Sequence, residues 1–254
     1  MTQILRLTLH ELKSLFYAPS TYIAMVLSLL MMGFFYFMTL LTVSAEEQDQ
    51  LPPTLFFSLF WVPVLLIVPM LTMRSFAEER RLGTIETLLT APVNPSQLVV
   101  SKFLAAYCFY VLVWGLSIAF PAITSFSLQQ PELHARLFHG GAMTGGFLFI
   151  ALSGCLFVSI GIFTSSLTRS QLVAGMLSFS ILFMLIVGIA AIHMLQQELS
   201  TGTLLSDTVL DYFQIFDHFD DFSRGLVDTR PFAYYLSGTV AILGLAVLVL
   251  ETKR

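Results

Sequence analysis

Long apolar stretches without charged residues alternate with short charged segments along the whole chain. Six of these stretches hold the roughly 20 apolar-dominated residues that a helix needs to cross the hydrocarbon core of a bilayer. None has the alternating pattern of a membrane β-barrel, so the backbone must satisfy its own hydrogen bonds in helices. We therefore predict an all-α, polytopic membrane protein with a single transmembrane domain over residues 1–254. The predicted spans lie near 22–43, 53–73, 99–127, 141–166, 171–195 and 231–250.

The composition supports a membrane location. Of the 254 residues, 56% are apolar and only 11% are charged, whereas about 25% of the residues in a soluble domain are charged. Such a chain cannot cover a compact globule with a solvated surface, which excludes a soluble enzyme, a nucleic-acid-binding domain and a disordered chain. Cys108 and Cys155 both lie within apolar stretches, so we expect free thiols rather than a disulfide.

The basic residues concentrate on one side of the predicted spans. Nine of the twelve lie there: Arg6, Lys13, Arg74, Arg80, Arg81, Lys102, Arg169, Lys253 and Arg254. Lysine and arginine are enriched in cytoplasmic segments of membrane proteins. We therefore predict that both termini are cytoplasmic, which agrees with the even number of spans.

Residues 1–20 are predicted to form an amphipathic helix at the membrane interface. The apolar residues recur at helical spacing, and the basic residues fall on another face. The apolar set is Leu5, Leu9, Leu12 and Phe16, and the basic set is Arg6, His10 and Lys13. Contact with the cytoplasmic leaflet is the favoured interpretation, and docking of a partner protein is the alternative.

The segment 74–97 is predicted to be a cytoplasmic loop that contains a short helix. Gly83 can end the helix that continues from the second span, because glycine tolerates a left-handed backbone. Thr84 can cap a new helix with Glu86 in its first turn. Asn94 and Pro95 can begin the third span as the capping residue and the first helical residue.

Three apolar residues of this loop, Ile85, Leu88 and Leu89, share one face of the predicted short helix. So short a helix is marginal on its own, and an exposed apolar face on it favours docking against a partner. Packing of the same face against the bilayer surface is the alternative, and the residues alone do not distinguish the two.

The loop also carries a motif. It reads Glu79-x-x-x-Gly83-Thr84-x-Glu86-x-Leu88-Leu89-x-x-Pro92, followed by Ser101-Lys102 at the start of a span. This motif resembles the coupling-helix region of ABC type-2 exporter permeases, and the resemblance extends over essentially the whole chain. The family usually has glycine at the position of Ser101. The resemblance implies a permease subunit in a bacterial inner membrane, with a second, identical or related permease subunit and two separate ATPase subunits that bind ATP and Mg²⁺.

The same resemblance implies which residues transmit force from the ATPase. These ATPase-coupling residues are Glu79, Arg80, Arg81, Gly83, Thr84, Ile85, Glu86, Leu88 and Leu89. We expect Glu79 and the two arginines to fix the end of the second span relative to the coupling helix through charge-assisted hydrogen bonds. For the arginines, anchoring of the membrane orientation is the alternative.

The outer segment 196–230 has apolar residues at spacings of three and four with acids between them. It predicts short amphipathic helices that lie in the outer leaflet or cover the exit of a path, with Phe216 and Phe219 buried and Asp211 and Asp221 facing water. The spacing His218-Phe219-x-x-Phe222-x-x-Gly225-x-x-Asp228 resembles the gliding-motility-type subset of these permeases. The candidate residues are Tyr212, Phe216, His218, Phe219, Phe222, Gly225 and Asp228.

The sequence offers no energy source and no catalytic site of its own. It contains no GxxxxGK[ST] phosphate-binding loop, and Lys102 is the one charged residue inside a predicted span. We therefore expect a non-catalytic subunit without metal or cofactor, whose energy comes from a partner ATPase. The alternative function is a non-transporting membrane scaffold that recruits a cytoplasmic partner through the loop 74–97. The substrate stays unassigned.

Overall fold

A computed structural model describes residues 2–45, 51–84, 94–128, 137–199, 214–225 and 229–252. These residues form helices and turns, with no β-strand among them. The helices are α1 (Thr2–Tyr17), α2 (Pro19–Ala45), α3 (Pro52–Ser58), α4 (Trp61–Thr72), α5 (Ala77–Leu82), α7 (Pro95–Leu116), α8 (Ala119–Leu128), α10 (Gly140–Leu167), α11 (Gln171–Phe183), the π-helix η1 (Met184–Gly188), α12 (Ile189–Leu199), α14 (Ile215–Ser223) and α15 (Thr229–Glu251).

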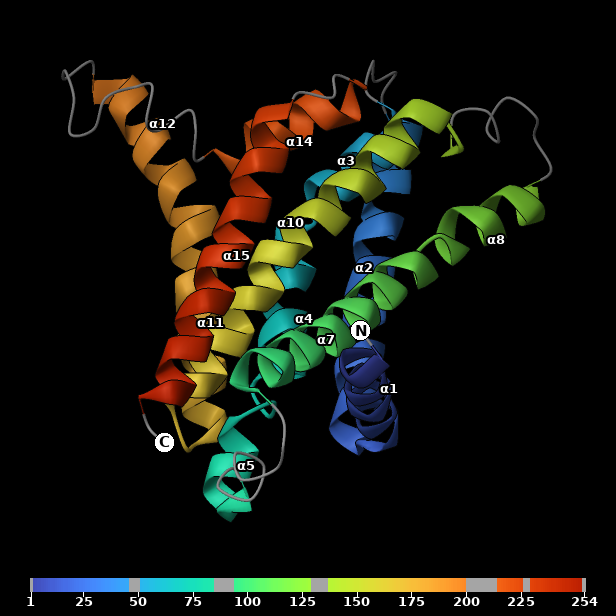
Figure 1. Cartoon of the computed structure of the whole chain (residues 1–254). Coiled ribbons are helices and arrows are strands. Elements are labelled where there is room, and N and C mark those ends of the chain that lie inside the picture. Colours follow the sequence, from blue (N-terminus) through green and yellow to red (C-terminus); the bar gives the residue numbers. More distant parts are fainter. Residues whose placement is uncertain are drawn as a thin grey trace.

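Six stretches of helix in the described residues are long and apolar enough to cross a membrane, which confirms the predicted fold class. They are Pro19–Val43, Trp61–Leu82, Pro95–Ser127, Gly140–Leu167, Gln171–Ile192 and Thr229–Glu251. The protein is therefore a multi-pass membrane protein. In Figure 1, α5 and the C-terminus lie at one end of the bundle, called here the α5 end, and α3 and α14 lie at the opposite end, the α14 end.

The second and third spans differ in detail from their predicted bounds. The predicted span 53–73 is split into α3 and α4 by a turn at Leu59–Phe60, shortly before Pro63, which has no N–H to continue the helix. The third span is likewise interrupted at Ser117–Ile118, four residues before Pro121. Together α7 and α8 run obliquely across the bundle (Figure 1).

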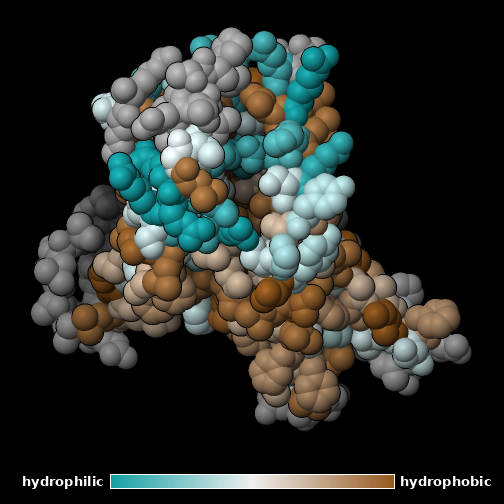
Figure 2. Space-filling view, turned by 90° about the horizontal axis from the view of Figure 1, so that it is seen from below, coloured by the Kyte–Doolittle hydropathy of each residue, from teal (hydrophilic) through white to brown (hydrophobic). Residues whose placement is uncertain are grey.

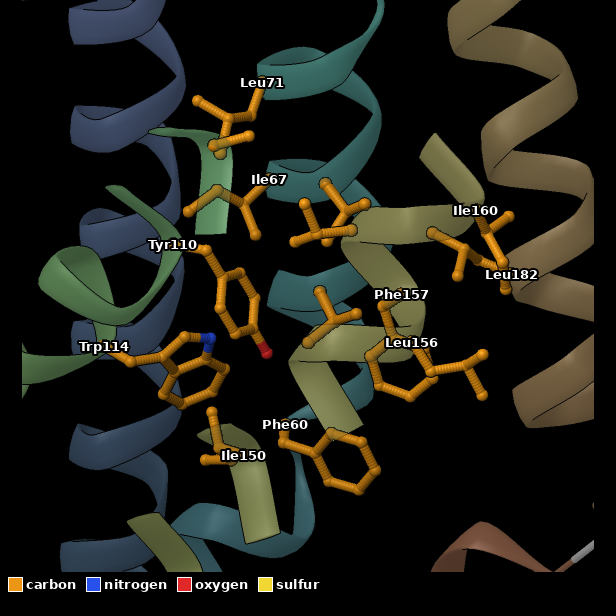
Figure 3. Packing of buried hydrophobic residues seen from close by; sticks show 14 of the residues in the cluster. Phe60, Ile67, Leu71, Tyr110, Trp114, Ile150, Leu156, Phe157, Ile160 and Leu182 are labelled. Atoms are coloured by element: carbon orange, nitrogen blue, oxygen red, sulfur yellow. The ribbon is translucent and has the colours of Figure 1, made fainter. Parts of the chain in front are cut away.

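Helix α10 is the centre of the bundle and contacts α4, α7, α11, α14 and α15. Figure 3 shows Tyr110 and Trp114 of α7 near Ile67 of α4 and Ile150 of α10, and Phe157 of α10 belongs to the same hydrophobic core. All five side chains are buried. Because lipid tails are as apolar as these side chains, close packing rather than exclusion of water favours this arrangement in a membrane.

Small residues on α10 allow this close packing. A Cβ atom at Gly154 would overlap the ring of Tyr110, and one at Gly161 would overlap the side chain of Thr72. Glycine at these two positions therefore brings α7 and α4 against α10, as small residues do at helix contacts in membranes.

Helix α1 packs against α7 and, to a smaller extent, against α2. The Phe16 and Phe109 rings meet edge to face with centroids 5.4 Å apart. Leu5 and Leu9 stay exposed, so part of the apolar face is available to lipid. The interfacial helix predicted for residues 1–20 is thus also a structural part of the bundle.

Candidate functional site

A buried lysine joins three helices at the α5 end. Lys102, in the second turn of α7, is only 4% exposed. Its Nζ atom lies 2.6 Å from Glu79 Oε1 of α5 and 3.0 Å from Glu11 Oε1 of α1, and 5.4 Å from the centre of the Phe76 ring. A buried ammonium group is costly unless it is paired. The two carboxylates provide that pairing and so fix α1, α5 and α7 relative to one another.

A second ion pair lies beside the first. The guanidinium of Arg74 bonds to both carboxylate oxygens of Glu78, at 2.8 and 3.0 Å, and donates through Nη1 to the Ser20 hydroxyl at 2.6 Å. The bidentate geometry is the one that arginine and carboxylate groups favour. This pair connects the beginning of α2 to the turn between α4 and α5.

A cavity of about 220 Å³ lies between these groups. Its charged lining consists of Glu11, Arg74, Glu78, Glu79 and Lys102, so the carboxylates exceed the basic groups by one charge. The Oε2 atom of Glu79 is buried and has no hydrogen-bond partner in the described part of the chain. The α5 end of the bundle therefore contains a polar, charged interior, in contrast to the apolar core of Figure 3.

Ser165 holds the beginning of α5 against α10. Its hydroxyl oxygen accepts hydrogen bonds from the backbone N–H groups of Phe76 and Ala77, at 3.0 and 3.2 Å. The same hydroxyl group donates a hydrogen bond to the Met73 carbonyl oxygen at 3.2 Å. A six-residue helix gains little from its own hydrogen bonds. Its position is therefore set by Ser165 on one side and by Lys102 on the other.

The end of α5 follows the prediction. The helix stops at Leu82, and Gly83 has a left-handed backbone with φ = 73°. The Thr84 hydroxyl donates to the Glu79 carbonyl at 3.3 Å. The remaining coupling residues Ile85, Glu86, Leu88 and Leu89 lie outside the described residues. On the far side of the loop, α7 begins at Pro95, as predicted, and the extended residue Asn94 occupies the capping position without a side-chain hydrogen bond to the helix.

The three residues expected to make charge-assisted hydrogen bonds, Glu79, Arg80 and Arg81, differ in their contacts. Glu79 bonds to Lys102 of α7. The Nε atom of Arg80 is buried without a hydrogen-bond partner among the described residues, and Arg81 is exposed. Glu11 and Ser165 were not among the residues predicted for this site. A signal for Glu11 existed, because a lysine inside an apolar span needs a nearby acid, and few acids lie on its side of the spans.

The α14 end carries the second group of predicted site residues. Helix α14 is amphipathic, and its Phe219 and Phe222 are buried against Phe149 of α10, with ring centroids 5.5 and 6.0 Å apart. Phe60 also packs against Phe219, with ring centroids 6.0 Å apart. Phe216, predicted to be buried, is only partly so. The apolar face of α14 thus packs on protein, and the helix covers this end of the bundle.

Two further contacts fix α14 in place. The His218 Nδ1 atom lies 3.4 Å from the Tyr235 hydroxyl of α15. A Cβ atom at Gly145 would overlap the Phe222 carbonyl oxygen, so the backbone of α14 touches α10 directly. Gly225 has φ = 80° and turns the chain after α14. The candidates Tyr212, Asp211 and Asp228 lie outside the described residues.

The fold and the charged α5 end define a multi-pass membrane protein whose polar interior lies next to the loop between the second and third spans. Residues 45–216, more than half of the chain, match the sequence profile of the ABC-2 family transporter proteins. The chain belongs to this family, whose members are membrane components of ABC transporters and work with ABC ATPase partners. A comparison with curated proteins finds no match.

Proposed function

We propose that this chain is the transmembrane permease subunit of an ABC exporter. A separate cytoplasmic ATPase subunit binds ATP and Mg²⁺, and a second permease subunit, identical or related, completes the path through the membrane. Family membership and the six spans support the permease role. The distribution of lysine and arginine supports an inner-membrane orientation with both termini in the cytoplasm. The motif from His218 to Asp228 supports a place in the gliding-motility-type subset.

The observation that carries the coupling role is the pairing of Lys102 with Glu79 and Glu11. The loop 74–97 contains α5 near its beginning, so a force applied to the rest of the loop acts first on α5. Because Lys102 bonds to Glu79 and Glu11, and Ser165 bonds to the first turn of α5, such a force reaches α1, α7 and α10 together. ATP hydrolysis by the partner would in this way move several spans at once.

The experiment compares Glu79→Gln with the exposed control Glu251→Gln in the complex of this chain with its ATPase, reconstituted in lipid. Glutamine keeps the size of Glu79 and one oxygen acceptor but removes its charge. We expect normal insertion and normal ATPase binding, with ATP turnover reduced by about tenfold, which corresponds to ~1.4 kcal/mol. The control should keep wild-type turnover.

The same experiment separates the permease from the alternative scaffold. A scaffold needs only to hold its partner, so the partner's turnover would not depend on a charge between α5 and α7. Wild-type turnover in Glu79→Gln, with the ATPase still bound, would therefore contradict the coupling role.

A further inference from the structure

The polar cavity of about 220 Å³ at the α5 end has more carboxylates than basic groups in its lining. Arg74 is neutralised by Glu78, to which it donates two hydrogen bonds. Lys102, in contrast, is shared by two carboxylates, those of Glu11 and Glu79. One carboxylate therefore has no cation of its own. A cation inside this partly enclosed space is attracted more strongly than a cation in bulk water.

The two basic groups of the lining leave little for an anion to bind. Arg74 donates to both oxygens of Glu78 and to the Ser20 hydroxyl, and Lys102 is buried against its carboxylate partners. An anion would have to displace these groups. Glu11, on the other hand, uses only its Oε1 atom for a hydrogen bond among the described residues, and its side chain is 23% exposed. Its second oxygen can therefore accept a hydrogen bond from a ligand.

Hydroxyl groups complete the polar lining. They belong to Ser14, Ser20, Thr21 and Ser75. Thr21, in the first turn of α2, is only 5% exposed, and its hydroxyl makes no hydrogen bond to another described residue. A buried hydroxyl without a partner costs free energy. A ligand with hydrogen-bond donors would satisfy it, because a hydroxyl oxygen has two lone pairs that accept.

An organic cation suits this lining better than a metal ion does. Within the described residues, no three acidic, histidine or cysteine side chains come together closely enough to hold a metal ion. A primary ammonium group needs only one oxygen for each of its three N–H donors. The cavity has the volume of about seven water molecules, which is enough for an aminoethyl group. The carbon atoms of such a group match the apolar part of the lining, which is formed by Leu15, Ala18, Met70 and Leu71.

The cavity opens beside exposed apolar side chains. Ser14, an exposed residue of α1, lines it, and the nearby rings of Phe16 and Tyr17 are 37% and 85% exposed. Seen from the α5 end, hydrophilic residues gather over this end and hydrophobic residues cover the flanks (Figure 2). A phospholipid can therefore place its headgroup in the cavity and its acyl chains along α1.

We propose that this cavity binds a primary ammonium group, and its surroundings favour the headgroup of phosphatidylethanolamine as the source. Glu11 and Thr21 accept hydrogen bonds from the ammonium group, and the ammonium charge neutralises the excess carboxylate. Hydrogen bonds to a charged donor are the stronger kind. The ATPase takes no part in this site, so the proposal does not depend on the proposed transport function.

The test is lipid binding by the purified chain, measured by native mass spectrometry with phosphatidylethanolamine and phosphatidylcholine. The two lipids carry the same charges, but the methylated nitrogen of choline has no N–H to donate. The variants are Glu11→Gln and Thr21→Val. Thr39→Val is the matched control, because Thr39 is a buried threonine of the same helix whose hydroxyl donates to the Phe35 carbonyl, away from the cavity.

We expect phosphatidylethanolamine to bind about tenfold more weakly to Glu11→Gln and about fivefold more weakly to Thr21→Val. The control and the phosphatidylcholine affinity should not change. Thr21→Val leaves every charge of the lining in place, so it tests the cavity even where Glu11→Gln shifts the ion pairs.

Three results would overturn the proposal. Equal binding of the two lipids by the wild type would show that no N–H donor is recognised. Unchanged phosphatidylethanolamine affinity in both variants would show that the lipid binds elsewhere. Stronger lipid binding by Glu11→Gln would show that the basic groups attract the headgroup phosphate.

Free ethanolamine distinguishes the two sources of the ammonium group. If it displaces the lipid, the ammonium group alone is sufficient and the cavity is a site for small amines. If it does not, the acyl chains contribute and the site is one for lipid. Both results support recognition of a primary ammonium group, provided that Glu11→Gln and Thr21→Val weaken the binding.

Discussion

The buried charge of Lys102 leads to a prediction about stability. In Lys102→Met the side chain keeps nearly the same length, but Glu79 and Glu11 lose the ammonium group that lies 2.6 and 3.0 Å from them. Their side chains are 21% and 23% exposed, so water solvates them only in part. Removal of one partner from a buried ion pair costs about 3–5 kcal/mol. We expect the lower end of that range, about 3 kcal/mol.

Replacement of all three charged groups by neutral ones should restore most of the stability that Lys102→Met loses. The triple variant Lys102→Met, Glu79→Gln, Glu11→Gln buries no unpaired charge, and replacement of a whole buried ion pair is often nearly neutral. We expect it to cost about 1 kcal/mol, which makes the combination far from additive. The assay is reversible unfolding of the purified chain by SDS in mixed micelles, followed by circular dichroism. Lys13→Met, an exposed lysine on α1, is the control and should change the free energy of unfolding by less than about 0.5 kcal/mol.

Two results would refute the reasoning. If Lys102→Met were as stable as the wild type, the lysine would not hold the three helices together. The second result is additivity. If the loss of unfolding free energy in the triple variant equalled the sum of the losses in the three single variants, the three groups would act independently rather than as one network.

Three further outcomes are expected. Leu88→Asp should abolish capture of the ATPase in a pull-down, because it places an unpaired charge in the expected interface, and capture at wild-type yield would contradict the coupling-helix assignment. Gly145→Ala should destabilise the chain by about 1–3 kcal/mol in the same SDS titration, because its methyl group meets the α14 backbone, whereas Gly140→Ala, with open space around it, should not. A membrane-impermeant maleimide added from outside should label Arg224→Cys readily and Phe222→Cys poorly, and equal labelling would show that α14 does not pack on the bundle.

Much of the bundle follows from the sequence because membrane spans must be long, apolar and helical. The six spans and the glycine end of α5 needed only local information. The break between α3 and α4 also has a local cause in Pro63, although the uninterrupted apolar pattern concealed it. The sequence thus determines the elements more directly than their contacts.

The contacts at the α5 end depend on packing that the sequence pattern does not contain. Glu11 and Lys102 are 91 residues apart, and they meet only because α1 lies along α7. The apolar face of α1 suits lipid and a neighbouring helix equally well, because both are apolar. The pattern of residues 1–20 therefore predicts the helix but not the surface against which it packs. Lys102 alone indicated that some partner was needed.

The two ends of the bundle are held by different forces, and this difference bears on how the protein moves. At the α5 end, Lys102 and Ser165 make directional contacts to a six-residue helix, and separation of the ion pairs would leave charges unpaired in the protein interior. At the α14 end, apolar rings such as Phe149 and Phe219 provide most of the contact, and apolar contact has no preferred direction. A force on the loop 74–97 should therefore move α1, α5 and α7 as one unit, whereas a movement of α14 relative to α10 would separate apolar contacts and the His218–Tyr235 contact rather than buried ion pairs. Under the proposed permease function, the α14 end is then the end at which a path through the membrane opens with the smaller cost.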